Sequence, residues 1–250
     1  PNRVQHVDAQ KQWELRQQPE WKIFQKENPT WQARFDQKTE LPYRAWGKGI
    51  PFSTESEAIL QKEIMQWISE QSIFAIKTSE LRWKDIAFDS RSGRHYLHLD
   101  QIQSLTEEVF NPFRNETIET VRVWRSGIDL RLQDSSMTQF SAQIHPDLSS
   151  QEWRVEIDAL QAFEIAKQRG GTTHSLHLNK DAELVILPIE RSGALNYRLC
   201  WEIRSETERP LGQWVSFVDA NTGEVLNRYN EIRFLDGVIF AEHDTRTVDG

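Results

Sequence analysis

Polar and apolar residues alternate in four short runs in the last third of the chain, and a helical pattern comes just before them. Asp158, with Gln161 three residues later, forms a capping box, and the apolar residues that follow recur at helical spacing until Gly170 and Gly171. A two-residue period is typical of strands. The runs therefore predict strands at residues 184–189, 197–203, 214–218 and 224–229. One helix followed by a meander predicts an α+β unit.

The first half of the chain shows a similar design. Thr54 and Glu57 form a capping box, and apolar residues at helical spacing predict a helix over residues 55–71. Turn residues at 90–93 and 134–136 separate short alternating runs. These runs predict strands at residues 73–77, 83–88, 95–102 and 121–132. We expect them to form a curved antiparallel sheet on the single helix.

Two modules of this kind account for the length of the chain. Its 250 residues exceed the commonest domain size of about 100–150 residues. The first segment is rich in Gln, Lys and Glu, and we interpret it as an N-terminal arm. The predicted fold is α+β with two modules, each a curved antiparallel sheet packed on one main helix. The predicted segments are an arm at 1–30, modules at 31–152 and 153–235, and a linker or the start of a next domain at 236–250.

The amino-acid composition indicates that the chain folds, and it argues against nucleic acid and membranes as partners. The chain is only 38% hydrophobic, but its 10 Trp and 12 Phe residues supply large apolar surfaces, so we expect it to fold. A formal net charge of −8 argues against a general affinity for nucleic acid or for an anionic membrane surface. The longest apolar runs, such as residues 184–189, are much shorter than the ~20 residues that a spanning helix needs.

Histidine and cysteine offer little for catalysis or metal binding. Cys200 is the only cysteine, and we expect a semi-buried thiol on a strand, because a nucleophile needs a base nearby. Two His-x-x-His spacings occur, but residues three apart on a strand point to opposite faces, and no cysteine or nearby acidic ligand completes either pair. We therefore predict no metal site at His95 with His98 or at His174 with His177.

Other catalytic and binding motifs are absent from the sequence. It contains no His-Glu-x-x-His, no Gly-x-Ser-x-Gly, no P-loop and no dinucleotide fingerprint. We therefore expect no catalytic residue and no cofactor. A basic and aromatic cluster occurs at Arg122, Trp124, Arg125 and Arg131. A nucleic-acid surface is one interpretation of this cluster, but in an acidic chain we favour a solvated strand face.

The segment from Trp214 to Ile232, with turn residues from Asp219 to Gly223, carries a resemblance to a known family. It resembles the end of the propeptide of thermolysin-like and fungalysin-like zinc metallopeptidases, the region called PepSY. Residues 31–51 and 121–130 are similar to the earlier propeptide module of this family, called FTP. The resemblance spans about residues 31–235 and implies two cystatin/PepSY-like modules.

The resemblance implies a role as intramolecular chaperone and inhibitor of a metallopeptidase catalytic domain that lies in cis. It also implies a secreted or periplasmic location and no catalysis by the chain itself. The candidate segment for contact with the protease cleft, or for cleavage, is Asp236, Gly237, Val238, Ile239, Phe240 and Ala241. The alternative is that residues 238–241 are a further sheet strand or begin the next domain.

Two other functions remain open at this stage. The chain could be a stand-alone secreted or cell-surface binding module that holds its partner with exposed aromatic residues. It could also be a small hydrolase whose site no motif reveals. A reading frame that continues into a His-Glu-x-x-His domain would distinguish a peptidase precursor from a binding module.

Overall fold

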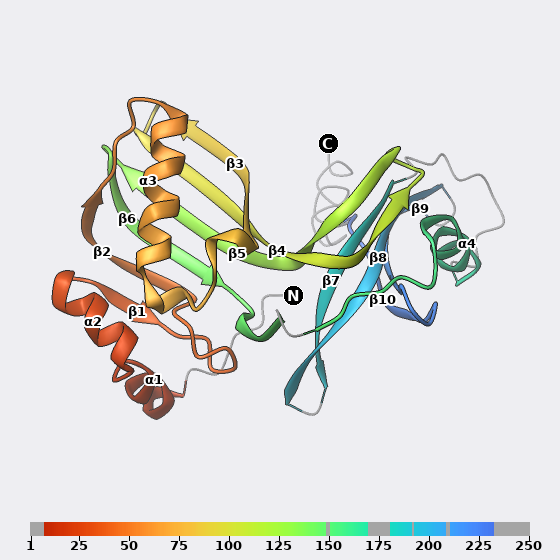
Figure 1. The fold of residues 1–250 in the computed structure, drawn as a ribbon, viewed down its shortest axis with the longest axis horizontal. Helices are drawn as coiled ribbons and strands as arrows, with labels where there is room; N and C mark the ends of the chain where they lie inside the picture. The colour runs from red at the N-terminus through yellow and green to blue at the C-terminus, as the bar shows by residue number, and fades with distance from the viewer. Residues whose placement is uncertain (1–7, 149–150, 170–180, 192, 209–210, 233–250) are drawn as a thin grey trace, which may run out of the picture. The chain divides into compact units, whose positions relative to one another are not determined.

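The computed structural model of the protein describes residues 8–148, 151–169, 181–191, 193–208 and 211–232. Contacts within the chain divide it into two compact units (Figure 1). Unit 1 comprises Pro1–Thr106, Glu119–Trp153 and Ile186–Tyr197. Unit 2 comprises Glu107–Ile118, Arg154–Val185 and Arg198–Gly250. Each unit is therefore assembled from segments that are distant in the sequence.

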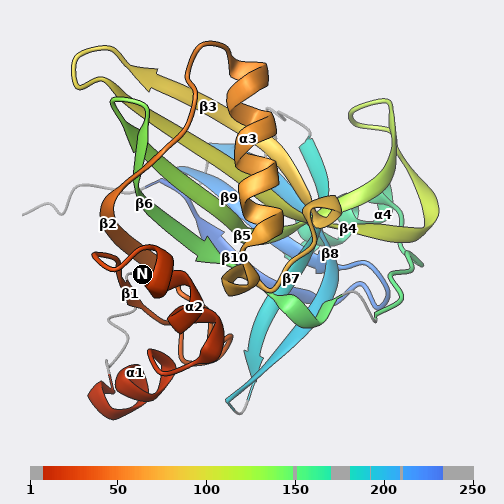
Figure 2. The ribbon, with the colours of Figure 1, turned by 60° about the vertical axis from the view of Figure 1, so that its left-hand side comes forward.

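Unit 1 is built on strands in the order β1-β2-β6-β5-β4-β3. Their bounds are β1 Gln32–Arg34, β2 Arg44–Pro51, β3 Leu81–Asp89, β4 Arg94–Asn111, β5 Glu116–Gln133 and β6 Ser136–Gln143. Helix α3 (Glu57–Glu70) lies across one face of this sheet (Figures 1 and 2) and buries Leu60, Ile64 and Ile68. Alternate strand residues meet this helix, and among the buried ones are Ala33, Ala45, Leu97, Leu99, Leu130 and Phe140.

Two short helices at the start of the chain belong to the core of unit 1. They are α1 (Ala9–Leu15), capped by the Asp8 carboxylate, and α2 (Pro19–Glu27). Trp21 and Phe24 are buried, and the Phe24 ring lies edge-on to Phe140 with 6.0 Å between centroids. The described part of the segment that the sequence suggested as an arm thus packs into unit 1.

Three details of unit 1 differ from the sequence prediction. Helix α3 is capped by Ser56, whose hydroxyl accepts from the Ile59 amide, whereas the Thr54 hydroxyl bonds Ser135 instead. The strand predicted at residues 73–77 is wrong, since its first two residues belong to the 3-10 helix η1 (Ser72–Phe74), Ala75 follows at φ 47°, and the 3-10 helix η2 (Thr78–Glu80) begins after Lys77. Strand β6 was not predicted at all. It follows a tight turn in which Asp134 and Ser135 have positive φ.

Unit 2 contains the four strands that the sequence predicted and one helix. The strands follow the order β5-β7-β8-β9-β10, with bounds β7 Asp181–Arg191, β8 Ala194–Glu208, β9 Leu211–Asp219 and β10 Val225–Asn230. Helix α4 (Ala159–Arg169) contacts β9 and β10 and buries Ala159, Ala162, Phe163 and Ala166. The predicted α+β class, with one main helix for each sheet unit, is confirmed.

The grouping of segments in space differs from a simple division along the sequence. Residues 107–118, which form the hairpin end of β4 and β5, are grouped with unit 2 although they precede the other residues of that unit. The boundary at residues 152 and 153 stays a prediction. Among the helices of the described residues, none combines the length and the apolar character that crossing a membrane requires.

Candidate functional site

His98 on β4 is the centre of a charged cluster in unit 1. Its Nδ1 lies 2.6 Å from Oδ1 of Asp129 on β5, and its Nε2 lies 3.1 Å from Oδ1 of Asp100. The hydrogen bonds to Asp100 and Asp129 raise the pKa of His98 to about 9. At neutral pH the ring is therefore an imidazolium with both nitrogens donating, so it has no free lone pair for a metal ion or a proton.

Of the other histidines in the two His-x-x-His spacings, only His95 lies within the described residues. The His95 ring packs on Phe88 with 4.5 Å between centroids, and it does not join His98 in a shared site. His174 and His177 lie outside the described residues. Over the ranges that the structure describes, no group of three or more His, Cys, Asp or Glu side chains is arranged to hold a metal ion.

Cys200 on β8 is buried rather than semi-buried. Its Sγ lies 3.4 Å from the Arg198 carbonyl, to which it donates, and none of the residue is exposed. Burial raises the pKa of the Cys200 thiol, and the nearby Asp219 carboxylate raises it further. A thiol that stays protonated and out of reach of solvent is not a nucleophile.

The turn that carries the family resemblance is held together by Asp219. One of its carboxylate oxygens accepts from the amides of Asn221 (3.0 Å) and Thr222 (2.9 Å), and the other accepts from Nε of Arg198 at 2.6 Å. Burial alone would raise the pKa of Asp219, but these hydrogen bonds lower it below its usual range. The predicted turn after β9 is confirmed, and the Asp219 carboxylate stabilises it through these hydrogen bonds.

The same turn fixes the start of helix α4. The Ile157 amide donates to the Ala220 carbonyl at 2.8 Å, and Nε1 of the buried Trp201 donates to the Ile157 carbonyl at 2.7 Å. Asp158 and Gln161 then exchange hydrogen bonds between side chain and backbone in both directions, which confirms the predicted capping box. The sequence features that point to the family therefore hold the helix on the sheet of unit 2.

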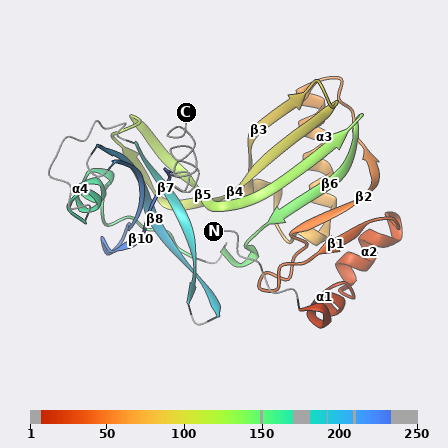
Figure 3. The same cartoon turned by 180° about the vertical axis from the view of Figure 1, so that it is seen from behind.

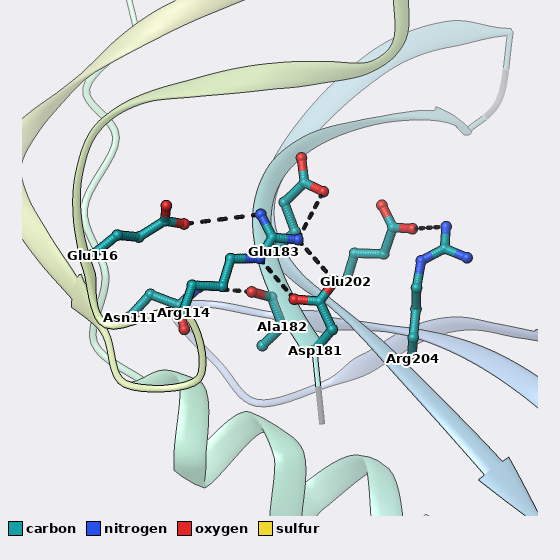
Figure 4. A network of polar contacts seen from close by, with 8 residues as sticks. All are labelled: Asn111, Arg114, Glu116, Asp181, Ala182, Glu183, Glu202 and Arg204. Carbon is teal, nitrogen blue, oxygen red and sulfur yellow. Dashed lines mark hydrogen bonds and ion pairs between the residues drawn. The ribbon is translucent and has the colours of Figure 1, made fainter. Parts of the chain in front are cut away.

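The hairpin end of β4 and β5 is bound to β7 by a polar network (Figure 4). The buried Asn111 side chain donates to the Ala182 carbonyl at 2.7 Å. Arg114 makes two hydrogen bonds to Asp181, at 2.7 and 2.8 Å, and a longer one to Glu183. The hydrogen bond to Asp181 is the main cause that raises the pKa of Arg114. These contacts attach the upstream hairpin to the strands of unit 2.

Figure 4 shows a second ion pair, between Glu202 and Arg204, in which a buried carboxylate is neutralised. The side chain of Glu202 on β8 is almost fully buried, and one of its oxygens lies 2.6 Å from Arg204. Arg204 also lies 2.8 Å from Glu231. Within the described part of unit 2, the arginines Arg114, Arg198 and Arg204 thus all have carboxylate partners.

Two arginines of the predicted basic and aromatic cluster lie against different aromatic rings. The Arg125 guanidinium lies over the Trp124 ring, 4.2 Å from its centroid. Arg131 instead lies over Tyr96 on β4, with 5.6 Å to the ring centroid. The predicted contact or cleavage segment from Asp236 to Ala241 lies outside the described residues.

Strand β10 is an edge of unit 2. Among the described strands it pairs only with β9, and it ends the strand order. Tyr229 on β10 stacks on Phe217 and the Arg228 guanidinium lies over Trp214, so this strand is held to its neighbour through side chains as well. An edge of this kind offers backbone groups that an extended polypeptide can pair with.

Comparisons with known proteins identify the module around this turn. Residues 156–229 match the family model PepSY, described as peptidase propeptide and YPEB domain. Two solved structures are similar to the chain at low identity. The Bacillus megaterium YpeB C-terminal domain matches at 14% identity and a TM-score of 0.38, over 81% of this chain and 77% of that one. The YpmB protein from Bacillus subtilis matches at 15% identity and a TM-score of 0.21, over 60% of this chain and 87% of that one. No match was found among the curated proteins.

The chain therefore contains a PepSY domain at residues 156–229. PepSY domains are non-catalytic modules of the propeptide and inhibitor type, and they are typically extracytoplasmic. The part of the sequence resemblance that concerned PepSY is confirmed. The resemblance of the first module to FTP and the association with thermolysin-like enzymes stay predictions.

Proposed function

We propose that this chain is the propeptide of a secreted zinc metallopeptidase, and that it acts in cis as intramolecular chaperone and inhibitor of the catalytic domain. The observation that carries the proposal is the PepSY match over residues 156–229, because domains of this type are propeptide-like. The chemistry of the described residues supports it. His98, Cys200 and Asp219 each serve a structural contact, and none is available as a nucleophile or a general base.

Tethering makes such a role physically reasonable. A module joined to its target by a short linker experiences an effective concentration in the millimolar range, so a modest intrinsic affinity keeps the target occupied. Cleavage of the linker then releases it. We place the contact or cleavage segment at Asp236, Gly237, Val238, Ile239, Phe240 and Ala241, which follow the last described residues.

Edge strand β10 can bind the catalytic domain by backbone pairing. A catalytic domain that is still folding exposes extended segments, and backbone pairing with an edge strand recognises such segments with little dependence on their sequence. Pairing of this kind suits a chaperone, since it templates a strand and is reversible. We therefore assign the chaperone role to edge strand β10 of unit 2.

Three measurements test this proposal. The reading frame beyond Gly250 should continue into a domain with His-Glu-x-x-His, and a stop codon there would contradict action in cis. The chain should also increase the yield of active enzyme when a denatured thermolysin-type catalytic domain is refolded. A variant lacking residues 236–250 should assist refolding of the enzyme as effectively as the full chain does, but it should inhibit the enzyme less. Equal inhibition by both would exclude the segment from the cleft.

A second function has a specific observation in its favour. Several large apolar side chains of the described residues are more than half exposed, among them Trp13 (59%), Phe88 (59%) and Phe110 (57%). A stand-alone binding module would use such side chains to hold a polypeptide or polysaccharide. Affinity for peptidoglycan or a surface glycan, lost in a triple alanine variant of these three residues, would favour this function over the propeptide role.

A further inference from the structure

The sheet of unit 1 has one face that α3 covers and one that α3 does not cover. Figure 3 shows the second face toward the viewer, with α3 behind the strands. We name it the open face of unit 1. Strand register and side-chain contacts place these residues on it: Gln32, Arg34, Arg44, Trp46, Arg82, Lys84, Asp85, Asp89, Arg94, Tyr96, His98, Asp100, Asp129, Arg131, Gln133, Gln139 and Ser141.

Two parallel rows cross this face at right angles to the strands. One row begins with Arg34 and Arg44, which are direct partners on β1 and β2. In the other row Gln32 pairs with Trp46, and strand register continues the row through Gln139 to Arg131, which lies over Tyr96. Five strands at about 4.8 Å spacing make this second row about 19 Å long. The face is therefore a platform wide enough for a polypeptide segment.

The arginines of the open face form no close ion pair with a described residue, although Arg94 lies opposite Asp89 in the strand register. None of Arg34, Arg44, Arg82, Arg94 and Arg131 forms an ion pair with a described residue, whereas the three arginines of the polar contacts in unit 2 all do. Arg44 and Arg94 make only long hydrogen bonds, each 3.4 Å, to glutamine side chains. Guanidinium groups of this kind keep their capacity for bidentate pairing with carboxylates.

The charge of the open face is opposite to that of the whole molecule. Five arginines, Lys84 and protonated His98 outnumber Asp85, Asp89, Asp100 and Asp129, which gives the face a net charge of +3 in a chain of −8. A basic surface on an acidic protein attracts anionic groups locally while the rest of the molecule repels them, so it orients an approaching partner.

We propose that the open face of unit 1 binds an acidic segment of a partner polypeptide, whose carboxylates pair with Arg34, Arg44 and Arg131. Trp46 and Tyr96, both more than one third exposed, flank the segment with apolar surface. This surface lies outside the PepSY match, so the inference does not depend on the role proposed for unit 2.

The geometry favours a polypeptide over a nucleic acid. Trp46 and Tyr96 stand three strand steps apart, about 14 Å, which is too far for successive bases to stack on both rings. By strand register Asp129 lies in the same row as Arg34 and Arg44, and it is two residues from Arg131 on β5. Its carboxylate repels a continuous phosphate backbone that follows these arginines, whereas spaced carboxylates can avoid it.

Charge reversal tests the proposal directly. The probe is a fluorescein-labelled peptide of about 12 alternating Glu and Ser residues, which is long enough to cross the face. Its binding to the full chain is followed by fluorescence anisotropy at about 0.02 M salt, where surface charges are weakly screened. The double variant Arg34→Glu with Arg44→Glu should weaken binding about tenfold or more, because two attractive contacts become repulsive.

The control carries the same change of charge on the other side of the sheet. Lys26→Glu on α2 with Lys62→Glu on α3 alters exposed lysines of the covered side, and it should leave binding of the probe unchanged. An equal loss in both double variants, or no binding by the unmodified chain, would overturn the proposal. Tighter binding of an oligothymidylate with the same number of charges would also overturn it and assign the face to nucleic acid. Circular dichroism of each variant checks that it is folded.

Discussion

Replacing Asn111 by alanine is expected to loosen unit 2 although the residue lies outside the PepSY match. The Asn111 side chain is fully buried, and it donates to the Ala182 carbonyl at 2.7 Å and accepts from the Phe113 amide at 3.1 Å. A net contribution of about 1 kcal/mol for each bond, plus the cost of leaving buried polar groups without these partners, gives about 2–3 kcal/mol. The hairpin would then separate from β7 more often.

Native-state hydrogen exchange followed by mass spectrometry measures this opening. A loss of about 2–3 kcal/mol should speed exchange of the amides in β7 by about 30-fold to 150-fold, since each 1.4 kcal/mol is a factor of ten. Thr117→Ala, an exposed change in the same hairpin, serves as the control and should have little effect. If β7 exchanges at the wild-type rate in Asn111→Ala, the hairpin is not an integral part of unit 2 and this account of the polar network is wrong.

Three further changes test other parts of the structure. Trp201→Phe should lower the free energy of unfolding by about 1–3 kcal/mol in urea, because it removes the buried hydrogen bond to Ile157; an unaltered midpoint would contradict this. Protonated His98 should stabilise the fold by about 1–2 kcal/mol after solvent screening. This contribution should be complete below the unfolded pKa of about 6.5 and lost as the pH rises to about 9. An NMR titration that gives His98 a pKa near 6.5 would refute this prediction. Cys200 should stay unmodified by a thiol reagent until the chain unfolds, and rapid labelling of the native protein would show that it is accessible.

Local signals in the sequence were sufficient for much of unit 2. The capping box of Asp158 and Gln161, the turn at Asp219 and the four alternating runs each depend on neighbours within a few residues, and each appears in the structure. The extents were less accurate, since β8 runs from Ala194 to Glu208 and is much longer than its apolar core. Propensity marks the buried middle of a strand better than its solvated ends.

Long-range contacts account for what the sequence did not reveal. Thr54 looked like a helix cap, but its hydroxyl is engaged by Ser135, 81 residues away. The hairpin around Arg114 could not be assigned to unit 2, because its partners Asp181 and Glu183 lie far along the chain. The open face of unit 1 was equally hidden, since the pairing of Arg34 with Arg44 depends on strand register.

Inhibition of a peptidase by the isolated chain tests the central claim most directly. The activity of a thermolysin-type zinc peptidase on a short peptide substrate is measured while the 250-residue chain is titrated in, with electrophoresis to confirm that the chain stays intact. A non-catalytic propeptide module should reduce the rate in a saturable manner. An unchanged rate at every concentration of intact chain would contradict the account.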